Sequence, residues 1–159
     1  MPFSVEKDLT AISLVGFTAP AIVAHPSAPF NDLKGMTAYA KANPGKHSYG
    51  PSGIGTGTHL SAEALQSAAS MKLTHVPYKG TGQIAADLLA AVIPLSFESS
   101  LTTALPNVKE GKLKVIAMTS AKRSRTLPSV PTVSEQGFPG FDVEGWFGLM
   151  GPAGLQGTS

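Results

Sequence analysis

The chain has 159 residues, of which 42% are apolar and 14% charged, and its formal net charge is +2. A chain of this length can bury roughly 70% of its unfolded surface, so we predict a single domain over residues 1–159. The scattered Lys and Arg residues give no nucleic-acid footprint. The chain has no cysteine, which excludes disulfides and thiolate metal sites.

The two ends of the chain lead us to expect a segment of a longer protein. Residues 1–8 lack the basic and apolar regions of a signal peptide, and the tail 151–159 ends without a capped element. No apolar run in the sequence reaches the roughly 18 residues that are needed to cross a bilayer.

The first half of the sequence predicts strands, a helix and a glycine-rich loop. Short apolar runs at 11–17 and 21–25 are typical of buried strands. Asn31 or Asp32 can cap a helix that runs through Ala42. The loop 50–57 follows a short strand at 47–49.

A second helix, over 58–69, is expected to follow this loop, with an apolar face made of Leu60, Ala64, Leu65 and Ala68. The elements expected after it are a strand at 73–76, a helix at 84–91, a strand at 92–97, a helical turn capped by Ser99 or Ser100, a helix from Pro106 to Gly111, a strand at 113–118, a short helix at 130–136 and extended chain at 141–150.

Strands and helices alternate from residue 46 to residue 118, which predicts an α/β fold with a mostly parallel or mixed sheet and helices on both faces. Ligands of such sheets lie beyond the carboxyl ends of the strands. Both glycine-rich loops, 50–57 and 80–82, follow a strand and precede a helix. We therefore expect them to converge at one edge.

The first loop matches no catalytic glycine motif. Thr56 stands where a P-loop needs lysine, and Ile54 stands where the nucleophile elbow needs its second glycine. The spacing of Gly53, Gly55 and Gly57 does not fit the dinucleotide fingerprint. Two interpretations stay open: an anion-binding nest of N–H and hydroxyl donors, capped by Thr56 or Thr58, and a structural turn without a ligand.

The second loop adds Tyr78, which we expect to anchor a ligand, and Lys79, which either binds the ligand or is solvated.

His59, in the first turn of a helix, is expected to be neutral and packed. Glu98 is the carboxylate nearest the predicted edge. Trp146 and Phe147 are expected to pack in a core or an interdomain seam. No nucleophile, base and orienting group come together, so we expect no enzyme, no metal and no cofactor.

Several segments, in order, resemble the solute receptors of tripartite tricarboxylate transporters, the Bug family. They are Ala42-Asn43-Pro44-Gly45-Lys46, Ser52-Gly53-Ile54-Gly55-Thr56, His75-Val76-Pro77-Tyr78-Lys79-Gly80, Leu127-Pro128-Ser129-Val130-Pro131 and Gly137-Phe138-Pro139-Gly140-Phe141. The resemblance covers nearly the whole chain and implies one lobe of a type II periplasmic binding protein-like fold. It corresponds to the second lobe with its crossover segments, without the first lobe and the C-terminal helices.

The resemblance also implies a periplasmic receptor, not an enzyme, that captures a small carboxylic acid and works with membrane transporter subunits. Its ligand contacts in this chain are Ser52, Gly53, Thr56, Gly57, Thr58, Tyr78, Lys79, Gly80 and Thr81. Pro51 replaces a small polar residue of the family and removes one backbone donor.

Two other functions stay open. One is a small hydrolase or transferase that uses Ser52 as its nucleophile. The other is an interaction module that contacts a membrane partner through the basic segment 122–125, although such a short run is also typical of a solvated loop.

Overall fold

The computed structural model describes residues 4–78 and 80–154. The chain divides into two compact units, which are described separately. The sheet unit comprises residues 19–145, and the ribbon unit comprises the described parts of 1–18 and 146–159. None of the described helices is long and apolar enough to cross a membrane.

The ribbon unit pairs two strands taken from opposite ends of the chain. A short helix, α1 (Val5–Asp8), precedes β1 (Leu9–Thr18), which forms a two-stranded sheet with β7 (Gly145–Pro152). The strand predicted at 11–17 is confirmed as part of β1, but its predicted burial is wrong, because most of β1 is exposed. Trp146 and Phe147 are also exposed, at 63% and 61%, so they do not pack in a core of this chain, and their packing in an interdomain seam stays a prediction.

The sheet unit contains a five-stranded mixed sheet in the order β4-β3-β5-β2-β6. Its strands are β2 (Ala21–Ala24), β3 (Ser48–Gly50), β4 (Thr74–His75), β5 (Leu95–Glu98) and β6 (Lys114–Met118). β3 runs parallel to both β4 and β5, whereas β2 is antiparallel to both β5 and β6. Four strands therefore share one direction and β2 opposes them, which confirms the mixed α/β sheet.

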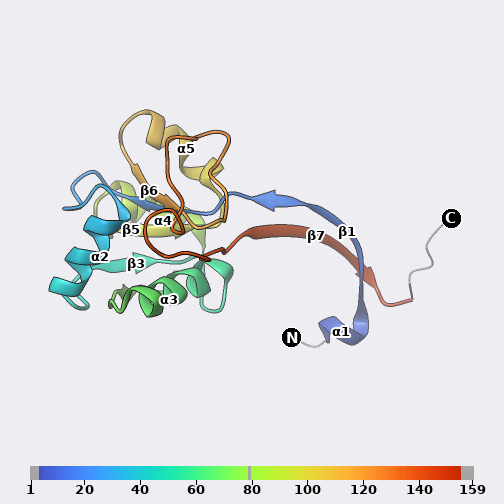
Figure 1. Ribbon diagram of the computed structural model, residues 1–159. Helices are drawn as coiled ribbons and strands as arrows, with labels where there is room; N and C mark the ends of the chain where they lie inside the picture. The colour runs from blue at the N-terminus through green and yellow to red at the C-terminus, as the bar shows by residue number, and fades with distance from the viewer. Residues whose placement is uncertain (1–3, 79, 155–159) are drawn as a thin grey trace. The chain divides into compact units, whose positions relative to one another are not determined.

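Helices cover both faces of this sheet (Figure 1). Residues of α2 (Leu33–Ala42) and α3 (Gly57–Ala69) belong to one buried cluster, and residues of α4 (Thr81–Leu89) and α5 (Leu101–Lys109) belong to another. The central strand β2 serves both clusters, because successive side chains of a strand point to opposite faces. Ile22 and Ala24 belong to the first cluster, whereas Ala21 and Val23 belong to the second.

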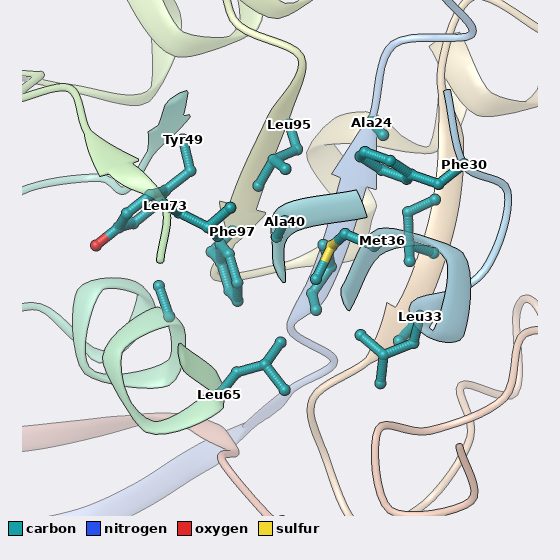
Figure 2. Packing of buried hydrophobic residues seen from close by; sticks show 14 of the residues in the cluster. Ala24, Phe30, Leu33, Met36, Ala40, Tyr49, Leu65, Leu73, Leu95 and Phe97 are labelled. Carbon is teal, nitrogen blue, oxygen red and sulfur yellow. The ribbon is translucent and has the colours of Figure 1, made fainter. Parts of the chain in front are cut away.

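The first cluster joins residues of four strands, β2, β3, β5 and β6, to α2 and α3, and Figure 2 shows part of it. The ring of Phe97 on β5 lies close to that of Tyr49 on β3, with centroids 5.6 Å apart. The side chains of Met36 and Leu65 reach this layer from α2 and α3, and both are fully buried. The helices are thus fixed to the sheet by apolar packing, which holds their N-termini in place.

Two predicted helices differ in the structure. α4 begins at Thr81, three residues earlier than predicted, with Gly80 at its N-cap. α5 is one helix with Pro106 inside it, not a turn followed by a new helix. Leu101 and Ala104 before the proline and Val108 after it pack in the same cluster. Continuous packing on one face thus outweighs the hydrogen bond that Pro106 cannot donate.

The predicted helix at 130–136 is wrong. An isolated bridge pairs Thr132 with Met118 of β6, which holds this residue in extended conformation. A single turn follows, in which the Thr132 N–H donates to Glu135 Oε2 (2.8 Å) and the Glu135 N–H donates to Thr132 Oγ1 (3.1 Å). Gly137, with φ +103°, follows this turn directly.

We expect Leu65→Ala and Leu60→Ala to differ sharply in their effect on stability, although the sequence placed both leucines on the apolar face of α3. Leu65 is fully buried, whereas Leu60 is 59% exposed. Truncation of a buried leucine costs about 2–5 kcal/mol of unfolding free energy, and truncation at an exposed position costs about 0.5 kcal/mol or less. Urea denaturation measures both values, and equal losses would contradict this assignment of the buried face.

Candidate ligand-binding site

The loops predicted to bind a ligand lie at one edge of the sheet. The register aligns Tyr49 with His75, and it aligns Ala21 with both Glu98 and Met118. The carboxyl ends of β3, β4, β5 and β6 therefore meet the start of β2. This confirms that the loops after β3 and β4 converge, and it adds the loop before β2 and the loop after β5.

A close backbone contact ties the two glycine-rich loops together. A Cβ atom at Gly50 would lie 2.9 Å from Cε2 of Tyr78 and 3.0 Å from Cδ1 of Ile93. No side chain fits there, so glycine at the end of β3 lets the Tyr78 ring pack against the strand. The second loop is held against the first by this contact.

A cluster of hydroxyl groups fixes the shape of the first loop. The Ser52 N–H donates to Thr58 Oγ1 (3.1 Å), and the Ser52 and Thr56 hydroxyls each lie 3.0 Å from that same atom. Thr56 Oγ1 also donates to the Gly53 carbonyl (2.7 Å). Gly53 has φ +141°, a conformation that side chains rarely adopt. Thr58, at 5% exposure, is the centre of the cluster.

Three helices begin at this edge, and they differ in how their first N–H groups are partnered among the described residues. Thr56 and Gly80 are the N-caps of α3 and α4, and neither makes a side-chain cap bond. In α5, by contrast, Leu101 N–H donates to Ala19 O (2.8 Å) and Thr102 N–H to Ser100 Oγ (3.3 Å). The first N–H groups of a helix need partners and carry its positive dipole. An anion at this edge would therefore meet α3 and α4.

The predicted ligand contacts of the second loop fall into different environments. Tyr78 is 7% exposed, and its hydroxyl donates to Asp87 on α4 (2.8 Å). Burial and this bond raise the pKa of Tyr78 to about 12. Gly80 is partly buried and Thr81 is exposed at the start of α4. Lys79 lies outside the described residues.

The imidazole of His59 packs beneath the first loop, as expected for this histidine. Its ring centroid lies 5.0 Å from that of His75, which lies 5.5 Å from Tyr49. The Gly55 N–H donates to His59 Nδ1 (3.4 Å). Burial and the neighbouring His59 lower the pKa of His75. These rings support the loop from below.

The alternative nucleophile, Ser52, has no base beside it among the described residues. Its hydroxyl is partnered by Thr58, whereas a nucleophilic serine needs an imidazole, amine or carboxylate within hydrogen-bond reach. In the basic segment 122–125, Arg123 Nε lies 2.8 Å from Glu135 Oε2, and its NH1 donates to Pro128 O. The Arg123 side chain is thus already bound to neighbouring residues of the same chain.

The sequence did not predict a cavity of about 230 Å³ between α4 and α5. Its lining includes Glu98 and the start of α4 at the carboxyl edge, and Leu113, directly before β6. The signal in the sequence was the alternation along β5, in which polar Ser96 and Glu98 are separated by Phe97.

Known proteins share this architecture. In R. palustris Rpa4515, whose structure contains adipate, the match covers 98% of this chain and 52% of that one, with a TM-score of 0.92 and 28% identity. For the periplasmic binding protein BugD, the TM-score is 0.85 and the identity 36%, over 93% of this chain and 49% of that one. The fold is that of a periplasmic binding protein.

Sequence comparison gives the family. Residues 1–158 match TctC, the tripartite tricarboxylate transporter family receptor. Protein BugT of Bordetella pertussis is 32% identical over 154 residues, which are 97% of this chain and 47% of that protein. The chain belongs to this receptor family, as the sequence motifs indicated, and it spans about half the length of the relatives that it matches.

We expect Thr58→Val to loosen the first loop while leaving the fold intact. Valine keeps the shape of threonine but leaves the Ser52 N–H without its acceptor, which costs about 1–2 kcal/mol of unfolding free energy. Hydrogen exchange at the Ser52 amide, measured by NMR, should become faster. Thr102→Val, at an exposed position of α5, is the matched control and should change neither quantity.

Proposed function

We propose that this chain is the ligand-binding part of an extracytoplasmic receptor that captures a small carboxylic acid for a tripartite tricarboxylate-type transporter. The observation that carries the proposal is the pair of helix N-termini, α3 and α4, without side-chain caps at one edge of the sheet. Such N-termini favour anions. The adipate in Rpa4515, a relative in fold and sequence, supports a carboxylate as the anion.

The donors come from both loops. The Gly57 and Thr58 amides open α3, and the hydroxyls of the first loop add polar contacts. On the second loop, the residues near the start of α4 supply the donors. Tyr78 contributes through its backbone, because its hydroxyl already donates a hydrogen bond to Asp87. The proposed contact residues are Ser52, Gly53, Thr56, Gly57, Thr58, Tyr78, Lys79, Gly80 and Thr81.

The family and the length of the relatives support three further parts of the proposal. The receptor works in the periplasm, delivers its ligand to membrane subunits and catalyses no reaction. Because the chain spans about half of its relatives, we propose that residues 1–159 form one ligand-binding lobe with its crossover segments, and that a second lobe supplies the remaining donors.

Gly57→Pro tests the backbone donor at the start of α3. Proline fits the first position of a helix and removes only the N–H, and Thr56 already has the extended conformation (φ −73°, ψ 163°) that a following proline requires. We expect adipate affinity in the full-length receptor to fall about 10-fold, the value of one hydrogen bond to a charged group. Isothermal titration calorimetry measures the change.

The matched control is Gly57→Ala, which keeps the N–H and has open space for its Cβ. We expect it to bind adipate like the unchanged protein. Equal affinities of the alanine and proline variants would show that this amide does not hold the carboxylate. Titration of residues 1–159 alone should give weaker binding than the full-length receptor, and equal binding would contradict the two-lobe proposal.

Ser52→Ala separates the receptor from the serine hydrolase. We expect no ester cleavage above the buffer rate in either the unchanged protein or the variant, because Ser52 has no base beside it. We also expect the variant to bind adipate more weakly. Turnover of a p-nitrophenyl ester that disappears in the variant would establish the enzyme instead.

A further inference from the structure

The cavity between α4 and α5 contains a carboxylate that the proposed anion site does not use. Glu98 ends β5 and lines the cavity, and Ser96 on the same face of the strand donates a hydrogen bond to Glu98 Oε1. Ser96 is fully buried and Glu98 is partly buried. A buried carboxylate has a large desolvation cost unless it is well paired, and among the described residues Ser96 is the one hydrogen-bond partner of Glu98.

The walls of the cavity define what can enter it. Thr81, Thr103 and Asn107 contribute neutral polar groups, and four other side chains contribute an apolar lining. The apolar residues are Ala85, Leu88, Ala104 and Leu113. The charged side chain among the described lining residues is Glu98, so an anion would meet repulsion there, whereas a cation would be paired.

The volume sets the size of the occupant. An apolar cavity of about 150 Å³ is large enough for benzene, and pockets for drug-sized ligands start at about 300 Å³. At about 230 Å³, this cavity has room for one end of a small ligand, such as a short aliphatic stem with a terminal polar group. The charge of Glu98 favours a cation as that group.

The cavity and the proposed anion site share the residue Thr81. Thr81 is both the first residue of α4, with its open N-terminus, and a lining residue of the cavity. A ligand with its carboxylate at the helix N-termini could therefore extend a second functional group toward Glu98.

We propose that Glu98 binds an ammonium group in this cavity, and that the preferred ligands of the receptor are small carboxylic acids that also carry an amine. This inference rests on the proposed function, because it assigns the second end of the same ligand. Burial raises the pKa of Glu98, against the lowering effect of the Ser96 hydrogen bond. An ammonium group stabilises the ionised carboxylate, so its binding should strengthen as pH rises through that pKa.

The ionisable residues within α4 and α5 do not compete for this role. Asp87 on α4 is bonded to the Tyr78 hydroxyl, and Lys109 is exposed in the last turn of α5. Neither residue lines the cavity.

The test compares 4-aminobutanoate with butanoate, which differ only by the ammonium group, in NMR titrations of the chain at pH 5 and pH 8. We expect 4-aminobutanoate to bind at least 10-fold more tightly than butanoate at pH 8, with shifts at the Thr103 and Asn107 amides, and the advantage to shrink at pH 5. In Glu98→Gln the two ligands should bind equally. Glu110→Gln, which removes the same charge at an exposed ion pair with Lys112, should behave like the unchanged chain.

A second variant and a second ligand keep the outcome decisive. Ala85→Leu adds volume at an exposed lining residue of the cavity without changing charge. We expect propylammonium to shift the Thr103 and Asn107 amides in the unchanged chain and to cause no such shifts in this variant. The proposal would be overturned if the unchanged chain bound 4-aminobutanoate and butanoate equally. It would also be overturned if Glu98→Gln still bound 4-aminobutanoate more tightly than butanoate. Adipate-induced shifts at residues 52–58 test the proposed carboxylate site separately. The proposal for that site and the proposal for Glu98 can therefore be contradicted independently.

Discussion

The common direction of four strands is the constraint on which the candidate site depends. Because β3, β4, β5 and β6 run the same way, every loop that follows them emerges at one edge, and every helix that returns from that edge begins there with its positive end. The loop before the reversed strand β2 supplies Ala19, whose carbonyl accepts a hydrogen bond from the first amide of α5. One of three helix N-termini thus has partners within the protein, and the other two have no side-chain cap.

The sequence predicted this arrangement well where local signals and the fold agree. The glycine-rich loop, the extended residue before it and the helix after it each have a local signature, so their order was clear from residues 46–69. The prediction from the sequence failed where tertiary packing determines which residues are buried and where a helix ends. The apolar face of α3 was misplaced because the buried face includes the polar residues Ser61 and Gln66, whereas Leu60, Ala64 and Ala68 are exposed. In α5 the helix continues through Pro106 because its buried face is continuous.

Side-chain roles were harder to predict than backbone positions. Tyr78 was correctly placed beside the first loop, but no sequence signal reveals that its hydroxyl is bonded to Asp87 nine residues later. The cavity was missed for a related reason: it is formed by the separation of two helices over one face of β5. Strand alternation put Ser96 and Glu98 on that face, yet only three-dimensional packing shows that α4 and α5 leave space above them.

The proposed recognition of an anion through peptide groups has a consequence for how such a protein diverges. A substitution replaces a side chain but leaves the amide in place, unless the new residue is proline, so an anion site made of N–H donors tolerates extensive sequence drift. Gly50 and Gly53 are the exceptions, one because a neighbouring ring fills the space and the other because its φ is +141°. We therefore expect natural variation in this edge to alter the hydroxyls and the cavity lining while the loop backbone keeps its course.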